Sequence, residues 1–358
     1  MCVKKIQITQ ILCALVLLLA LTGCSTEQGA DFTEGGTDAL GISTVEIEPY
    51  ENLIISDWPD ADTVVVSKEN ESLGKMQTAE LSDSYPRSLY LYHIADKEYT
   101  LLKARKDLNL DGATLSPDRK NLLYYGSSLG DLSYYVLNLK TLKEFAISGE
   151  PIGSAGSARW ADNDTVIGAG YTNGAYYADM TGKITPLEEL DGENVFLVAK
   201  INNIVYYNTQ EDNTLMSLDL STKETSRLDL SNVVALYPAP DGSRIALLQN
   251  TGEKQRLLLC DTNGDNAKTP AEGTEIGGVA WSHDRAMLAY SVNEESSDTT
   301  IGGLYLYDPA SGKAAQIAAD VRSIATCWSL TGKELAYTEW DGNRYHSGIV
   351  HLEYTEQK

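Results

Sequence analysis

The chain has 358 residues, of which 42% are hydrophobic, and its 51 acidic and 28 basic side chains give a formal net charge of −23 at pH 7. An acidic surface of this kind repels the phosphates of nucleic acids and the anionic headgroups of membranes. We therefore expect no nucleic-acid partner, and any attachment to a membrane has to come from something other than a basic patch.

The N-terminal segment has the pattern of an export signal. Residues 1–5 carry two lysines and no acid. The strongest apolar run, residues 11–20, is shorter than the ~20 residues that a membrane-spanning helix needs. A basic start, a short apolar core and small residues after it are typical of a signal peptide. We therefore expect residues 1–23 to be removed during export.

The segment Leu21-Thr22-Gly23-Cys24 follows this apolar core directly. It resembles the lipobox of bacterial lipoproteins, which consists of a leucine, two small residues and a cysteine. The resemblance implies that Cys24 carries diacylglycerol on its sulfur and becomes the first residue of the mature protein. Two or more acyl chains hold a protein stably at a membrane. We therefore expect a lipid-anchored protein on the extracytoplasmic face of the cell membrane, with an ordinary secretory signal or an uncleaved anchor as the alternative.

Residues 24–42 are rich in Gly, Thr and acids and lack apolar periodicity, which is typical of a flexible tether. Cys2 and Cys13 leave with the signal, so that only Cys260 and Cys327 remain besides the lipidated cysteine. Both lie in apolar, strand-like runs, and we expect buried free thiols. A disulfide between them is the alternative outside the cytoplasm.

Residues 43–358 contain seven similar units, of which residues 277–318 are the clearest. Each unit has a short apolar strand, a turn, a strand rich in aliphatics and Tyr, a variable loop, a third strand, and a second turn toward a fourth strand. Five of the six steps between the first turns are roughly 40 to 47 residues, the spacing of one propeller blade. These turns fall at Asp60, Asp118, Asp162, Asn202, Asp241, Asp284 and Thr331.

One such unit cannot cover both faces of its own sheet, so neighbouring sheets must stack face to face. We therefore predict an all-β fold, a β-propeller of seven four-stranded blades over residues 43–358, with six or eight blades as alternatives. The last unit ends after its third strand, where an unpaired sheet edge would expose backbone N–H and C=O groups and favour aggregation. We expect residues 43–49, which alternate apolar and polar side chains, to supply the missing outer strand, although they could belong to the tether.

The similarity between the repeated units is clearest in four segments. They are WSHDR (281–285), APDGSRIALL (239–248), SPDRKNLLYY (116–125) and LYLYDPASGK (304–313). They resemble the TolB-like, WD40-like propeller repeats, and the resemblance covers nearly all of residues 49–354. It implies a β-propeller fold. Two units depart from the family pattern: Ile201-Asn202-Asn203 stands where a Pro-Asp turn is usual, and His283 stands in place of Pro.

Two motif-like segments do not have the context that their chemistry needs. Residues 126–130 match the G-x-S-x-G nucleophile elbow around Ser128, but that motif needs a helix after it, and a strand-like segment follows. Residues 261–272 approach a calcium loop, with Asn266 where the EF-hand turn needs Gly. A hairpin between two strands explains these residues without a metal.

The histidines do not form a metal centre in the sequence, because no cysteine or acid completes a tetrahedral set with them. They are His93, His283, His346 and His351. We therefore expect no metal, no other cofactor and no catalytic residues.

The variable loops between the second and third strands are the expected binding surface, because propellers usually bind at a loop face or at the channel mouth. Residues 339–348 of the last unit include the Trp, Tyr and Arg that are favoured in hot spots. The candidate residues are Trp340, Arg344, Tyr345 and His346. We expect a monomeric, non-catalytic scaffold that binds a protein, peptide or glycan at the cell envelope. The alternative is an extracytoplasmic hydrolase or lyase with its site at the channel mouth.

Overall fold

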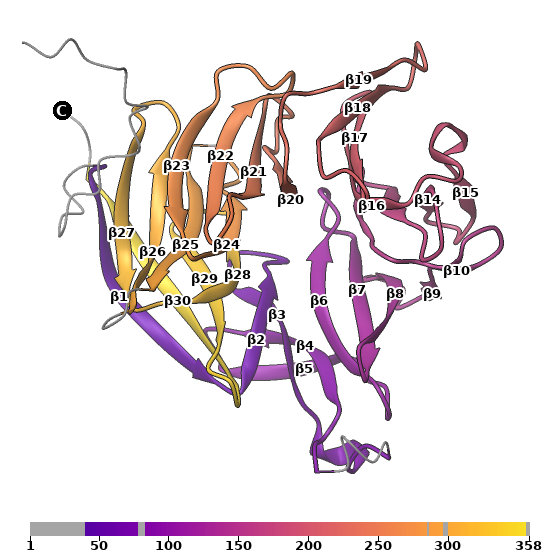
Figure 1. Cartoon of the computed structure of the whole chain (residues 1–358). Helices are drawn as coiled ribbons and strands as arrows, with labels where there is room; N and C mark the ends of the chain where they lie inside the picture. The colour runs from indigo at the N-terminus through magenta and orange to yellow at the C-terminus, as the bar shows by residue number, and fades with distance from the viewer. Residues whose placement is uncertain (1–39, 78–82, 285, 296–299, 356–358) are drawn as a thin grey trace, which may run out of the picture.

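The computed structural model describes residues 40–77, 83–284, 286–295 and 300–355, in which seven four-stranded antiparallel sheets form a ring (Figure 1). The predicted all-β propeller of seven blades is confirmed. In Figure 1 the colours follow one another round the ring, because each blade uses consecutive strands of the chain. No helix within the described ranges is long and apolar enough to span a bilayer.

Each blade has strands a to d, counted from the centre outward. The a strands are β2 (Leu53–Asp57), β6 (Asn109–Leu115), β12 (Arg159–Trp160), β16 (Val195–Ile201), β20 (Val233–Pro238), β24 (Glu275–Trp281) and β28 (Ser323–Trp328). The b strands are β3 (Thr63–Glu69), β7 (Asn121–Ser128), β13 (Thr165–Ala169), β17 (Ile204–Thr209), β21 (Arg244–Asn250), β25 (Leu288–Glu295) and β29 (Glu334–Trp340).

The c strands are β4 (Arg87–His93), β8 (Asp131–Asn138), β14 (Ala175–Asp179), β18 (Met216–Asp219), β22 (Gln255–Asp261), β26 (Thr300–Asp308) and β30 (Tyr345–Tyr354). The d strands are β5 (Glu98–Lys103), β9 (Glu144–Ala146), β15 (Ile184–Pro186), β19 (Thr225–Arg227), β23 (Lys268–Gly273), β27 (Lys313–Ala319) and β1 (Ile42–Glu51). The connections add a short hairpin, β10 (Ser148–Gly149) and β11 (Gly153–Ser154), and two 3₁₀ turns, η2 (Glu71–Leu73) and η4 (Glu188–Leu190).

The N-terminal strand closes the ring, as predicted. β1 pairs antiparallel with β30, from Ile42 opposite Tyr354 to Glu51 opposite His346. The strand is longer than the expected 43–49 and begins at Ile42, inside the predicted tether. Residues 1–39, which include the predicted signal peptide, Cys24 and most of the tether, lie outside the described residues.

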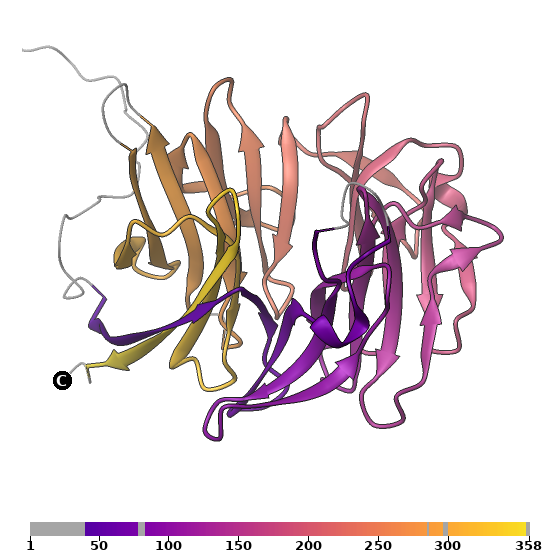
Figure 2. The same ribbon diagram turned by 90° about the horizontal axis from the view of Figure 1, so that it is seen from below.

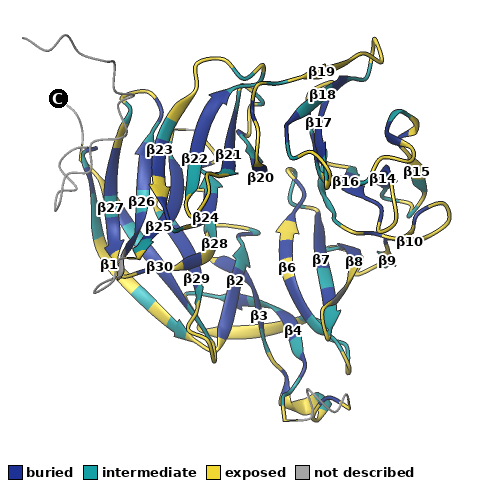
Figure 3. Ribbon diagram, viewed as in Figure 1, coloured by how far each residue is buried: buried dark blue, intermediate teal, exposed yellow. Residues whose placement is uncertain are grey.

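The blades hold one another together through seven hydrophobic clusters, and each cluster joins two neighbouring blades. Figure 3 shows the strands mostly buried and the connecting loops mostly exposed. Tyr124, Tyr176 and Tyr290 are fully buried in these interfaces. No sheet covers its own two faces, so the stability of each blade depends on its neighbours.

Indole N–H groups reinforce four of these joins at the ends of the a strands. Trp58 donates to the carbonyl of Cys327 at 3.3 Å, and Trp328 donates to that of Ala280 at 3.2 Å. Trp160 and Trp281 make the same bond, at 3.0 Å each, to the a strand of the preceding blade. A repeated tryptophan before the first turn therefore satisfies an inward-facing carbonyl of the neighbouring sheet.

The two described cysteines are free thiols, as predicted. Cys260 is buried, and burial raises the pKa of its thiol to about 11. Cys327 is only half-buried, whereas the sequence predicts a buried thiol. It lies on the innermost strand of its blade, where the ring has no further strand to cover it.

Candidate functional site

The strand order assigns every loop to one of two faces. Because the strands of a blade alternate in direction, the b–c loops and the d–a connections share one face of the ring. The a–b and c–d turns share the opposite face. We call these the b–c face and the a–b face.

Two of the four predicted binding residues form an aromatic pair on the b–c face. Trp340 ends β29 and Tyr345 begins β30, so that the b–c loop of blade 7 brings their rings together. The ring centroids are 4.6 Å apart with an interplanar angle of 50°. Trp340 is 45% exposed, and its indole therefore offers a large apolar surface to a partner.

Arg87, at the start of β4 in blade 1, extends this pair. Its guanidinium carbon lies 5.1 Å from the centre of the Tyr345 ring, within the range of a cation–π contact. Nε of Arg87 donates to Oδ1 of Asp111 in blade 2 at 3.0 Å, and the same oxygen accepts from Oγ of Ser67 at 2.6 Å. A chain of contacts therefore fixes the aromatic pair across three blades.

The other two predicted residues stabilise their own loop. Nε2 of His346 lies 2.8 Å from Oδ2 of Asp341, and Nδ1 lies 2.9 Å from Glu51 of the closing strand. The hydrogen bond to Asp341 raises the pKa of His346, and the pKa of Asp341 is lowered to about 2. Arg344 Nε is 4.0 Å from the same carboxylate. The structure thus separates two paired aromatic rings from two side chains that hold the loop.

Further apolar side chains are exposed on the b–c face around the channel mouth. Tyr171, in the b–c loop of blade 3, is 73% exposed, and Leu129 occupies the corresponding loop of blade 2. Phe196 and Ile324, which is 52% exposed, lie where the ladder between strands a and b shifts register. A bulge of this kind re-aims a side chain. Sequence periodicity alone places both residues in buried strands, so it does not identify them.

On the a–b face, a side-chain contact joins blades 2 and 6. Nη2 of Arg119 lies 2.9 Å from Nε2 of His283, and Nη1 of Arg119 donates to the carbonyl of Trp58. Burial and the nearby Arg119 lower the pKa of His283. Half-buried Asp57 accepts from the backbone N–H groups of Leu115 and Trp58 at 2.8 and 2.7 Å. Nε2 of His283 also lies 3.1 Å from the carbonyl oxygen of Trp328 in blade 7, so these contacts join the first two and the last two blades.

Arg159 on β12 makes a second crossing inside the ring. Its Nη2 donates to the carbonyl of Leu236, two blades further on, at 3.0 Å. Its Nη1 is buried without a hydrogen-bond partner among the described residues, and burial lowers its pKa.

The two motif-like segments fold as strand hairpins. Ser128 ends β7 and pairs with Asp131 at the start of β8, so a strand follows the G-x-S-x-G motif. Residues 261–272 connect β22 to β23, and Asn266 adopts a φ of 55° while its side chain bonds Asp261. Among the residues that the structure describes, no group of three or more His, Cys, Asp or Glu side chains is placed to hold a metal ion.

No known family model matches the chain. An oligogalacturonate lyase in complex with manganese has a TM-score of 0.60 and 12% identity, over 86% of this chain and 91% of that one. The Swd1 β-propeller domain of Myceliophteria thermophila has a TM-score of 0.57 and 10% identity, over 87% and 99% of the two chains. TolB from Acinetobacter baumannii has a TM-score of 0.48 and 13% identity, over 82% and 65%.

The chain has the β-propeller fold. At these identities the likeness shows the fold alone, and the propeller fold serves many unrelated activities. What this propeller does has to be argued from its own surfaces.

Proposed function

We propose that this protein is a non-catalytic binding module, held at the outer face of the cell membrane by lipid on Cys24, that binds an envelope protein, peptide or glycan on its b–c face. The observation that carries the proposal is that loops and strand ends of several blades expose aromatic and aliphatic side chains on that face, the Trp340–Tyr345 pair among them. Trp340 and Tyr345 form its most rigid part, because Arg87 and Asp111 hold the ring of Tyr345 from behind. Rigid aromatic side chains bind with little loss of conformational entropy.

The position of the N-terminal strand supports an orientation in which the b–c face points away from the membrane. β1 starts opposite the end of β30, so residue 42 and the C-terminal strand end lie together on the a–b face, as Figure 2 also shows at one edge of the ring. A flexible coil of residues 24–41 would span roughly 20–25 Å. A protein anchored through such a tether holds its a–b face toward the membrane and offers its b–c face to partners.

A second candidate is an extracytoplasmic lyase or hydrolase acting on a glycan at the mouth of the ring. An oligogalacturonate lyase has the same fold, so the fold is compatible with this candidate. The exposed Trp340–Tyr345 pair suits a sugar ring as well as a peptide side chain. Release of products from polygalacturonate or a related acidic glycan by the purified protein would establish it.

Variants on the two faces test the leading proposal. We expect Trp340→Ala to reduce recovery of the partner at least tenfold when the lipidated protein is crosslinked in cells and purified. Tyr354→Ala is the matched control, because Tyr354 is 43% exposed on the a–b face while Trp340 is 45% exposed on the b–c face. Equal recovery with both variants contradicts a b–c binding face.

Lipidation itself has a separate test. We expect Cys24→Ser to abolish incorporation of labelled fatty acid and to move the protein out of the membrane fraction. Labelled Cys24→Ser protein contradicts the predicted lipid site.

A further inference from the structure

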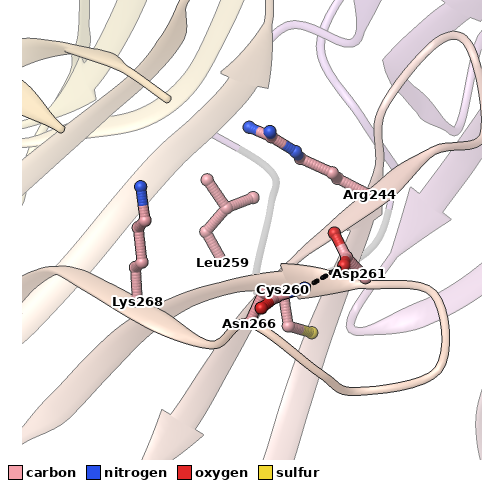
Figure 4. A pocket seen from close by; sticks show the side chains of 6 residues that line it. All are labelled: Arg244, Leu259, Cys260, Asp261, Asn266 and Lys268. Atoms are coloured by element: carbon pink, nitrogen blue, oxygen red, sulfur yellow. Dashed lines mark hydrogen bonds between the residues drawn. The ribbon is translucent and has the colours of Figure 1, made fainter. Parts of the chain in front are cut away.

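A hollow of about 330 Å³ lies on the a–b face, at the ends of the β21, β22 and β23 strands of blade 5. Its lining residues are Arg244, Leu259, Cys260, Asp261, Asn266 and Lys268 (Figure 4). Leu259 packs with Tyr307 and Ala314 of blade 6, so the hollow lies beside the join between two blades. Its volume is at the lower end of the range of small-molecule sites, ~300–1,000 Å³.

Two basic side chains face this hollow. Figure 4 shows Arg244 and Lys268 projecting into the same open space from either side of Leu259. Within the described part of the chain neither side chain has a hydrogen-bond or ion-pair partner. In a chain with a net charge of −23, two unpaired cations at one small hollow form a local site of opposite charge.

Arg244 remains unpaired although an acidic residue lies opposite it in the sheet. Arg244 lies directly opposite Asp261 in the ladder between β21 and β22, where opposite charges usually pair. Oδ2 of Asp261 instead accepts a hydrogen bond from Nδ2 of Asn266 at 2.6 Å. Asn266 can reach it because its own backbone is left-handed, with a φ of 55°. The guanidinium is therefore left available to a ligand.

We infer that this hollow binds the phosphate group of a small hydroxylated phosphate ester. Arg presents parallel N–H donors that match two phosphate oxygens, and Lys supplies a point charge from the other side. Leu259 lines the hollow but is only 2% exposed, so the charged and polar side chains supply most of the recognition. Asp261 repels a bare anion, but its carboxylate accepts a hydrogen bond from a ligand hydroxyl. The site therefore favours a phosphate ester with a hydroxyl over inorganic phosphate.

Such a group has two sources, a free polyol phosphate or the phosphoglycerol headgroup of a lipid. The site is on the face from which the N-terminal strand starts, so a headgroup is within reach if the protein is lipid-anchored. The inference itself does not depend on the anchor or on the b–c face, because it uses only residues of blade 5.

Calorimetric titration of the full-length protein in detergent with glycerol 3-phosphate tests the site. We expect saturable binding that Arg244→Met and Lys268→Met each weaken about tenfold, which corresponds to about 1.4 kcal/mol. Lys333→Met is the control, since Lys333 is an exposed cation in an a–b turn outside the hollow. We expect inorganic phosphate to bind more weakly than the ester. No saturable binding, or equal weakening by all three variants, overturns the inference.

Thermal unfolding distinguishes the two sources. A ligand that binds the folded state raises Tm in proportion to its affinity. If the headgroup is the source, phosphatidylglycerol added to the micelles raises Tm for the wild type but not for Arg244→Met, and phosphatidylcholine does neither. If only free esters bind, glycerol 3-phosphate raises Tm in the same way and the lipids do not. A wild-type Tm that none of these additions changes contradicts the site.

Discussion

Arg119 of blade 2 and His283 of blade 6 meet across the a–b face, with 2.9 Å between Nη2 and Nε2. The same Nε2 lies 3.1 Å from the carbonyl oxygen of Trp328 in blade 7, so that it faces a permanent donor on one side and an acceptor on the other. Two residues 164 positions apart in sequence thus span the join at which the ring closes. The lowered pKa of His283 follows from its burial and from the charge of Arg119.

The contact between Arg119 and His283 makes the free energy of unfolding depend on pH. His283 takes up a proton in the unfolded chain near pH 6.5, but only at lower pH in the folded protein. Its contribution is therefore complete above about pH 6.5 and is lost as the pH falls through the folded pKa. We expect His283→Gln to reduce the loss of stability between pH 7.5 and 5, measured by urea unfolding. A variant with the same acid-side loss as the wild type contradicts a lowered pKa of His283 in the folded protein.

The contribution of His346 to stability changes with pH in the opposite direction. Its hydrogen bond to Asp341 raises its folded pKa, so its contribution is complete below about pH 6.5 and is lost as the pH rises through the folded pKa. We expect His346→Gln to destabilise the protein at pH 5 and to have little effect at pH 8. The pair is partly exposed, so the effect is below about 1 kcal/mol. A larger loss at pH 8 than at pH 5 is the contrary result.

The closing strand carries a large part of the stability of the ring. Ile42 is 1% exposed and packs between blades 6 and 7, whereas Ile47 on the same strand is 36% exposed. We expect Ile42→Ala to lower the free energy of unfolding by about 2–4 kcal/mol, and Ile47→Ala to change it by less than about 0.5 kcal/mol. Equal effects in urea unfolding contradict the view that β1 belongs to the folded ring.

The hydrogen bonds from tryptophan indoles to neighbouring blades also contribute measurably to the stability of the fold. Trp328 is 2% exposed and donates to the carbonyl of Ala280, while the bond from Trp160 to Thr114 is exposed to solvent. We expect Trp328→Phe to cost about 1–3 kcal/mol, because it removes the donor of a partly buried carbonyl together with part of the buried indole. Trp160→Phe is expected to cost less than about 1 kcal/mol. The reverse order in Tm measurements argues against this role.

Arg159 offers a stabilising substitution. Its Nη1 is buried with no partner among the described residues, and burial disfavours its charge. Because Met keeps the length and apolar contacts of the side chain without a charge to desolvate, we expect Arg159→Met to raise Tm. A lower Tm shows instead that a group in the ring interior pairs with the guanidinium.

The sequence predicts local and repeated features well and long-range ones poorly. The turns near Asp118, Asp241 and Asp284 recur at a blade-like spacing, which is why the blade count is predictable. The alternation in residues 43–49 indicates a strand, and the missing strand of the last unit identifies its partner.

The contacts of the candidate site depend on ring closure, which no local pattern encodes. Arg87 meets Tyr345 only because blade 1 follows blade 7 in space. The bulges that expose Phe196 and Ile324 break strand periodicity at single residues. Arg244 lies opposite Asp261 in the sheet, yet the bond that the structure gives to Asp261 comes from Asn266 of its own hairpin, which a pairing rule based on sequence does not foresee.

The most direct test of the proposed function compares the two faces by photo-crosslinking in cells, with a crosslinking amino acid at single exposed positions. Tyr171, Ile324 and Trp340 represent the b–c face, and Leu142 and Leu330 represent the a–b face. The proposal predicts that the three b–c positions crosslink to a common partner and that the two a–b positions do not. Crosslinks to that partner from Leu142 and Leu330 alone, or equally from all five positions, would contradict it.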